Sequence, residues 1–194
     1  MDAKQIRLIL IAITVGCLGG GILLYQLFVK NMDMGSISDG MTTTEASGEN
    51  LETEDSILPD FTVYDRDGNA VKLSDFAGKP IVLNFWASSY GTCKAEMPFF
   101  DDAYNDYKDK VQFIMVNVTD GEQETLESAT QYIDSTVYRF PVYYDLDLEA
   151  STVFGVTSLP TTYFFDATGT PVAYAKTTMD VKKIKQGIEL ILQN

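Results

Sequence analysis

The segment that decides the fold reads Asn84-Phe-Trp-Ala-Ser-Ser-Tyr-Gly-Thr-Cys-Lys-Ala-Glu-Met-Pro98. It begins inside a short apolar run, Pro80-Ile-Val-Leu-Asn-Phe-Trp86, which is typical of a central strand buried on both faces. A helix is expected to follow from about Thr92 to Tyr107, with Pro98 bending it. Cys93 would therefore lie in the first turn of a helix that directly follows a buried strand.

The composition narrows the classes of function. The 194 residues have a formal net charge of −14, no histidine and two cysteines, Cys17 and Cys93. The acidic excess argues against nucleic acid or an anionic lipid surface as a partner, because both attract Lys and Arg. Without histidine, Ser-His-Asp and Cys-His catalysis are excluded, and we expect no metal site and no cofactor. Two cysteines in such different settings provide no disulfide framework.

The N-terminal part predicts a membrane anchor and a tether. Residues 8–29 carry no charge and would span about 33 Å as a helix, which matches the hydrocarbon core of a bilayer. Lys4 and Arg7 precede this run, so residues 1–7 are expected in the cytoplasm and the rest of the chain outside it. Residues 30–57 hold seven acidic residues. Such a segment buries too little apolar surface to fold, and we expect a flexible acidic linker.

Two alternatives to a single-pass signal-anchor stay open. A cleaved signal peptide normally has a shorter apolar region and a cleavage site of small residues. A lipoprotein signal would use Val15-Gly16-Cys17, although Thr14 replaces the usual Leu and apolar residues continue beyond Cys17. We expect the uncleaved anchor, with the C-terminal domain outside the cell membrane.

Residues 58–194 predict one α/β domain. The stretches 61–64 and 70–73 flank Asp67-Gly68-Asn69, which is a hairpin signal. Strands that alternate with helices, followed by a late hairpin around Asp166-Ala-Thr-Gly169, predict a three-layer sandwich with a mixed central sheet. The other expected elements are strands at 111–118, 140–144, 161–165 and 172–175, and helices at 122–133, at 146–154 and after the capping residue Asp180.

Four segments of this domain carry a resemblance to a known family: Leu58-Pro-Asp-Phe61, Leu73-Ser-Asp-Phe-Ala-Gly-Lys-Pro80, Asn84-Phe-Trp-Ala-Ser88 and Phe154-Gly-Val-Thr-Ser-Leu-Pro-Thr-Thr-Tyr163. With these segments the domain resembles the TlpA/ResA family of membrane-anchored, extracytoplasmic thiol–disulfide oxidoreductases. The resemblance implies a thioredoxin-like fold, a cis peptide bond before Pro160, and a protein or peptide partner outside the cytoplasm that can contain a thiol.

Tyr90 stands where this family has its first, attacking cysteine. That cysteine is exposed at a helix N-terminus, where the helix dipole lowers its pKa, and a second cysteine resolves the mixed disulfide. A phenol with a pKa of about 10 is no effective nucleophile at neutral pH and forms no disulfide. The substitution therefore excludes dithiol cycling within this chain.

Cys93 and Glu96 each have two interpretations. Cys93 is either a buried, inert small side chain or a single reactive thiol that forms a mixed disulfide with a partner. Glu96 lies three residues further on the same helix face. By resemblance it helps to move protons near the buried cysteine, and the alternative is a carboxylate that is simply favourable in the first turn of a helix.

The Pro160 loop is the expected binding surface. In the resembled family this loop faces the start of the helix and pairs its backbone with an extended peptide. We expect Leu159, Pro160 and Thr161 to form it, with Trp86 and Tyr90 at its flank. For Trp86 itself, simple core packing is the favoured alternative.

Two classes of function follow. The first is an oxidoreductase of this family that retains at most monothiol activity through Cys93. The second is a redox-inactive module that holds an extended peptide or an envelope partner at the Pro160 loop. A peroxidase would need a cysteine at the attacking position within a Pro-x-x-x-Thr-x-x-Cys pattern, which is absent.

Overall fold

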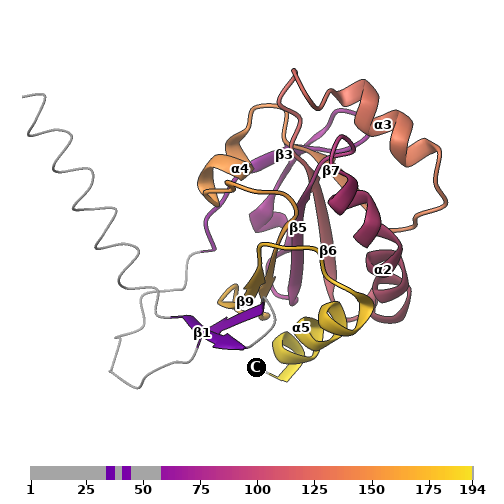
Figure 1. Ribbon diagram of the computed structural model, residues 1–194. Helices are drawn as coiled ribbons and strands as arrows, with labels where there is room; N and C mark the ends of the chain where they lie inside the picture. The colour runs from indigo at the N-terminus through magenta and orange to yellow at the C-terminus, as the bar shows by residue number, and fades with distance from the viewer. Residues whose placement is uncertain (1–33, 38–40, 45–57, 194) are drawn as a thin grey trace, which may run out of the picture. The chain divides into compact units, whose positions relative to one another are not determined.

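The computed structural model describes residues 34–37, 41–44 and 58–193, in which a mixed β-sheet forms the centre (Figure 1). β5 (Ile81–Trp86) pairs in parallel with β6 (Gln112–Asn117) and antiparallel with β8 (Thr161–Phe165). The other strands are β1 (Met34–Ile37), β2 (Met41–Thr44), β3 (Thr62–Tyr64), β4 (Ala70–Lys72), β7 (Val142–Tyr144) and β9 (Pro171–Ala175). Their order in the sheet is β1-β2-β9-β8-β5-β6-β7-β3-β4.

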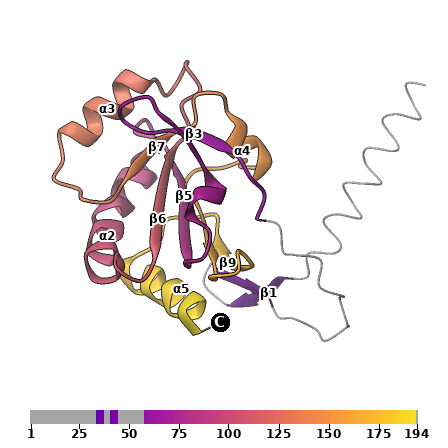
Figure 2. The ribbon, with the colours of Figure 1, turned by 180° about the vertical axis from the view of Figure 1, so that it is seen from behind.

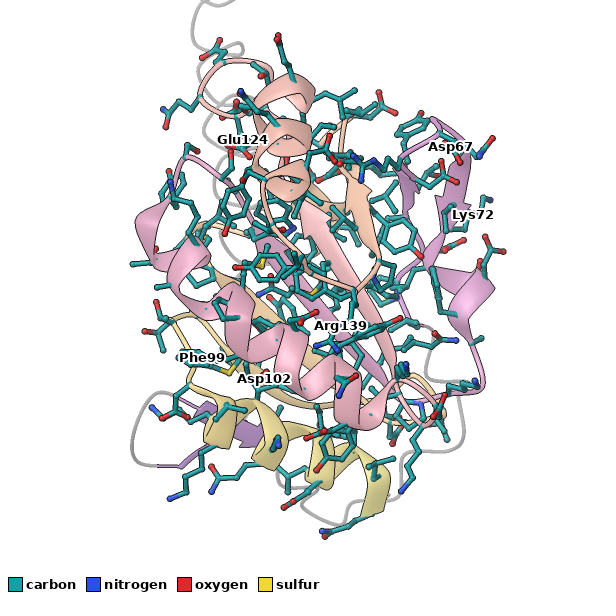
Figure 3. All side chains as sticks on the ribbon, turned by 90° about the vertical axis from the view of Figure 1, so that its right-hand side faces the viewer. Asp67, Lys72, Phe99, Asp102, Glu124 and Arg139 are labelled. Carbon is teal, nitrogen blue, oxygen red and sulfur yellow. The ribbon has the colours of Figure 1, made fainter. Side chains whose placement is uncertain are left out.

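Helices cover both faces of this sheet, because successive side chains of a buried strand point to opposite faces. Val82 and Trp86 of β5 pack against α2 (Gly91–Tyr107) and α5 (Val181–Gln193). Leu83 and Phe85 pack on the other side, towards α4 (Glu149–Val153) and the 3-10 helix η1 (Leu73–Phe76). Figure 2 shows the arrangement from behind, and Figure 3 shows α2 and α5 across the same face. The predicted three-layer sandwich with a mixed sheet is confirmed.

The two predicted hairpins and the last helix are confirmed. β3 pairs antiparallel with β4, and the Asp65 carboxylate accepts hydrogen bonds from the backbone amides of Asp67 and Asn69 in the turn between them. β8 pairs antiparallel with β9. α5 begins after Asp180, whose Oδ1 accepts a hydrogen bond of 2.8 Å from the Lys183 amide. This is the capping role that the sequence predicted.

The helix expected over 122–133 begins later. α3 spans Leu126–Asp134, and Thr125 caps it by accepting a hydrogen bond from the Ser128 amide. The four residues before Thr125 form a turn around Asp120, whose Oδ1 accepts hydrogen bonds from the amides of Glu122, Gln123 and Glu124. This local bonding competes with a helical turn, as Asp side chains commonly do.

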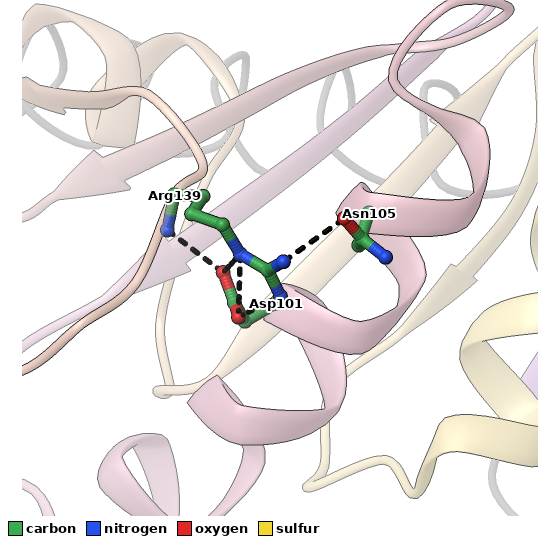
Figure 4. A network of polar contacts seen from close by, with 3 residues as sticks. All are labelled: Asp101, Asn105 and Arg139. Carbon is green, nitrogen blue, oxygen red and sulfur yellow. Dashed lines mark hydrogen bonds and ion pairs between the residues drawn. The ribbon is translucent and has the colours of Figure 1, made fainter.

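A charged contact ties α2 to the segment before β7 (Figure 4). Asp101 Oδ1 accepts a hydrogen bond of 2.7 Å from the Arg139 backbone amide, and Oδ2 accepts one of 2.6 Å from Arg139 Nη2. Arg139 Nη1 also donates to Asn105 Oδ1 at 2.9 Å. The contact joins two elements on the same side of the sheet as the start of α2.

Part of the segment predicted as a linker carries strands. β1 and β2 lie within residues 30–57, and Thr42 and Thr43 pair with Tyr174 and Ala173 of β9. These two strands were not predicted, and the expectation of a flexible linker is wrong for them. The anchor expected over residues 8–29 lies outside the described residues. No helix among the residues that are described has the length and apolar character to cross a bilayer.

Candidate functional site

The site begins where β5 ends and α2 begins. Tyr90 occupies the N-cap position of α2, has an extended backbone conformation and makes no side-chain capping hydrogen bond. Its side chain is 43% exposed, so a phenol stands at the surface position expected for an attacking group. The backbone amides of the first turn of α2 thus lie beside Tyr90, whose side chain accepts no hydrogen bond from them.

Cys93 lies one turn deeper and is not exposed. Its relative accessible surface is 0%, and it packs in the same core cluster as Trp86 and Met97. Burial raises the pKa of the Cys93 thiol to about 11, and the charges of Glu96 and Glu124 act in the same direction. At neutral pH this sulfur is therefore a protonated thiol without access to solvent.

Glu96 is a buried carboxylate, also with 0% exposure. Its Oε1 accepts a hydrogen bond of 3.0 Å from Asn84 Nδ2, and its Oε2 accepts one of 3.1 Å from the Met179 amide. Burial raises the pKa of the Glu96 carboxyl to about 7, although both hydrogen bonds act to lower it. This carboxyl can therefore exchange a proton near neutral pH, as the proton-transfer interpretation requires.

The loop between β5 and α2 is held by a second buried carboxylate, which the sequence did not identify. Glu124 is 1% exposed and accepts hydrogen bonds from the amides of Ser88 and Ser89 at 2.6 and 2.9 Å. Asn117 Nδ2 also donates to it at 2.8 Å. The only signal in the sequence is the Asp120-Gly121 pair, which marks a turn rather than a helix at this point.

The Pro160 loop lies next to the end of β5. Phe85 pairs with Thr161 in the antiparallel ladder, which places Pro160 alongside Trp86. The peptide bond between Leu159 and Pro160 is cis, as the resemblance implied. Among the described residues, no hydrogen bond engages the backbone amide or carbonyl of Leu159. The loop therefore offers an unpaired donor and acceptor close to the start of α2.

The predicted binding residues differ in exposure. Leu159 is half-buried, whereas Pro160 is buried, Thr161 is fully buried, and the Trp86 ring is 0% exposed against the ring of Tyr132. Thr161 Oγ1 donates internally to the Ser158 carbonyl at 2.7 Å. The structure brings all four residues to one end of the sheet. Trp86 occupies the core position that was its alternative interpretation.

The fold and the site define a thioredoxin-like protein whose helix-start position carries a phenol before a buried thiol. The AhpC/TSA family profile matches residues 55–174. The chain is 32% identical to the thiol-disulfide oxidoreductase ResA of Bacillus subtilis over 75% of this chain and 79% of that protein. The chain therefore belongs to the AhpC/TSA family, and within it to the ResA-like thioredoxin-fold proteins.

Other relatives agree with this assignment. ResA of Oceanobacillus iheyensis is 39% identical over 53% of this chain, and the match spans only about half, 52%, of that relative's length. Among solved structures, the pneumococcal exposed lipoprotein thioredoxin Etrx1 of Streptococcus pneumoniae strain TIGR4 superposes with a TM-score of 0.61 at 28% identity. That superposition covers 68% of this chain and 98% of the pneumococcal chain.

Proposed function

We propose that this protein is a ResA-like binding module that holds an extended segment of a protein partner outside the cytoplasm without turning over disulfides. One observation carries the proposal: Cys93, the single thiol among the residues that the structure describes, is 0% exposed, while the surface position in front of it is occupied by Tyr90. Disulfide exchange needs a thiolate that can reach the sulfur it attacks. A phenol at the surface and a protonated thiol in the core do not meet that requirement.

The binding surface consists of Tyr90, the half-buried Leu159 and the unpaired backbone groups of Leu159. An extended peptide adds to such a site by pairing its main chain with free amide and carbonyl groups, while a nearby pocket or ring contacts its side chains. Tyr90 provides a large surface at low cost in conformational entropy, because a tyrosine has only two χ angles. The chemistry therefore favours an extended polypeptide over a small molecule.

Membrane anchoring and an extracytoplasmic domain are part of the proposal. The uncharged run over residues 8–29 supports the anchor. The pneumococcal relative is described as an exposed lipoprotein, which supports a location outside the cytoplasm for this domain too. In intact cells, a membrane-impermeant lysine reagent is expected to label the C-terminal domain of the full-length protein. Labelling only after lysis would contradict this location.

A redox assay separates this proposal from the oxidoreductase interpretation. The full-length protein is expected to give no insulin-disulfide reduction above the dithiothreitol background, and Cys93→Ser should leave that result unchanged. Tyr90→Cys is expected to turn over, because the introduced thiolate attacks the insulin disulfide, Cys93 displaces the mixed disulfide, and dithiothreitol returns both sulfurs to thiols. Turnover in the native protein that disappears in Cys93→Ser would establish monothiol chemistry instead.

Binding itself is measured with carboxymethylated insulin B chain, an extended polypeptide without free thiols. We expect it to shift the backbone NMR signals of Leu159, Thr161 and the start of α2. Tyr90→Ala should weaken binding by about fivefold or more, since buried aromatic contacts dominate such interfaces. Val137→Ala is the matched control, because Val137 is 89% exposed and lies on the segment before β7. Equal loss in both variants, or no shifts near Leu159, would contradict the proposed surface.

A further inference from the structure

The loop that presents Tyr90 is fastened by one carboxylate. Glu124 Oε1 accepts hydrogen bonds from the Ser88 amide at 2.6 Å and from Asn117 Nδ2 at 2.8 Å. Its Oε2 accepts hydrogen bonds from the Ser89 amide at 2.9 Å and from Ser88 Oγ at 3.1 Å. Glu124 is 1% exposed, and no cation forms a salt bridge with it among the residues described. A carboxylate without a counterion can be buried only when hydrogen bonds replace its lost hydration.

Four donors converge on this side chain, and that number matters chemically. An ionised carboxylate has about four lone-pair sites and no donor, so it can accept all four bonds. A glutamine in the same place has a single acceptor oxygen, so its NH₂ group would face one of the two serine amides and leave that amide unpaired. The arrangement thus requires a glutamate rather than a polar residue of similar size.

The carboxylate is itself held from both sides. Asp120 Oδ1 accepts from the Glu124 amide at 2.9 Å, and the hydrogen bonds of this turn hold the pKa of Asp120 below its ordinary value. On the other side, Asn117 ends β6, and its Oδ1 accepts from Thr119 Oγ1 at 2.8 Å. The Ser88–Ser89 loop is therefore attached to the sheet through a chain of polar contacts rather than through apolar packing. Glu124 is labelled in Figure 3, beside α3.

We propose that Glu124 is a positioning residue, which fixes Ser88 and Ser89 against the end of β6 and so sets the place from which the side chain at position 90 is presented. Tyr90 directly follows the two serines whose amides the carboxylate binds. The role of Tyr90 in binding a partner rests on the function proposed above. The positioning of the Ser88–Ser89 loop by Glu124 does not depend on that function.

Amide exchange tests the positioning directly in the full-length protein. Glu124→Gln is expected to speed hydrogen exchange at Ser88 or Ser89 by about tenfold or more, because the serine amide that then faces the glutamine NH₂ group loses its acceptor. Amides inside β5 and β6 should be unchanged, and the emission of Trp86, the single tryptophan, should report an intact core. Glu122→Gln is the control, since Glu122 is exposed in the same turn. A folded Glu124→Gln protein with unchanged exchange at both serines overturns the proposal.

A second measurement uses the native protein, so that the test does not depend on the folding of a variant. The amides of Ser88 and Ser89 are expected to exchange at least about tenfold more slowly than amides of an unstructured peptide, although Ser89 lies at the surface, because the Glu124 carboxylate accepts from both. Exchange of both amides at the unstructured rate would overturn the proposal even if Glu124→Gln did not fold.

Insulin reduction by the Tyr90→Cys protein tests whether the position of the loop affects the reacting group at position 90. In the Tyr90→Cys protein, adding Glu124→Gln should lower kcat/KM for insulin reduction by about tenfold, because a misplaced reacting group loses much of its advantage. Tyr90→Cys with Glu122→Gln should keep the rate of Tyr90→Cys alone. If Tyr90→Cys itself shows no turnover, the proposed function of the site fails, while the exchange result still decides the role of Glu124. If Glu124→Gln changes neither kcat/KM in the Tyr90→Cys protein nor the hydrogen exchange of the two serine amides, the positioning role is contradicted.

Discussion

Asn84 and Glu96 form a buried pair in which only half of the amide is used. Asn84 Nδ2 donates to Glu96 Oε1 at 3.0 Å and to Thr162 Oγ1 at 2.9 Å, whereas Asn84 Oδ1 has no partner. An unpaired acceptor in a protein core is costly. Protonation of Glu96 would add an O–H donor to this pair, in which Asn84 Oδ1 is the acceptor that has no partner.

Stability should depend on pH through Glu96. The pKa of its carboxyl rises from 4.5 to about 7 on folding because the group is buried. The folded state then binds the proton more tightly than the unfolded state. The stabilisation of the folded state by this tighter proton binding at Glu96 is fully present below about pH 4.5, and it is lost as the pH rises through about 7.

Glu96→Gln removes this titration. Compared with the native protein, the variant should gain about 1–3 kcal/mol of unfolding free energy at about pH 8, and little at about pH 4. Urea unfolding of both proteins at several pH values provides the measurement, with Glu122→Gln as an exposed control. A difference that stays constant with pH would show that Glu96 does not titrate in this range.

Cys93 should resist alkylation in the folded protein. With a pKa of about 11, only about one thiol in ten thousand is ionised near pH 7, and burial removes access as well. In the native protein, iodoacetamide is expected to modify Cys93 only as fast as the structure opens, locally or globally. In denaturant, it should modify Cys93 at the rate of a free thiol. Tyr90→Ala tests whether the Tyr90 side chain alone shields the sulfur from the reagent. We expect little acceleration of alkylation in this variant, because the sulfur lies in the core. Fast modification of the native protein would favour a reactive monothiol.

The sequence was sufficient for the strands from β3 to β9 and for the thiol position, because these depend on local patterns, whereas β1 and β2 were not predicted. The run ending at Trp86, the hairpin after Thr161 and the cap at Asp180 are read from neighbours within a few residues. The resemblance located the cis bond before Pro160. The resemblance also implied that Trp86 lies at the binding surface, but the ring is buried against Tyr132. That contact joins residues far apart in the sequence, so local patterns could not predict it.

Glu124 shows what the sequence could not supply. In a predicted helix over 122–133 it looks like one of several acidic residues, and nothing marks it as buried. Its partners Ser88 and Ser89 are 36 and 35 residues away, so the contact exists only once β5 and β6 are paired. The turn at Asp120 shifts the helix start and directs Glu124 inwards. A local bond thus decided the position of a residue with long-range partners.

The Asp101–Arg139 contact should be asymmetric in its effect on stability. Asp101 is 9% exposed and serves both the Arg139 backbone amide and the guanidinium, whereas about half of the Arg139 side chain, 52%, remains exposed. Asp101→Ala should therefore lower the melting temperature more than Arg139→Ala, which leaves the backbone bond intact. Asp102→Ala is the control, because Asp102 is the exposed neighbour. A larger loss for Arg139→Ala would contradict this order.

Gly187 should not tolerate a methyl group. A Cβ added there would lie 2.5 Å from ring atoms of Phe164, although α5 as a helix would otherwise favour alanine. The ring cannot easily retreat, because Phe164 is fully buried and pairs with Val82 on one side and Ala173 on the other.

We expect Gly187→Ala to cost about 1–3 kcal/mol of unfolding free energy after the gain in helix propensity. Gly91→Ala is the matched control, since no atom lies within 4 Å of the added Cβ at the start of α2. Urea unfolding of the two variants gives the comparison. Combining Gly187→Ala with Phe164→Leu should cost less than the sum of the single changes, because the smaller side chain removes the clash. Additive losses would show that the strain arises elsewhere in α5.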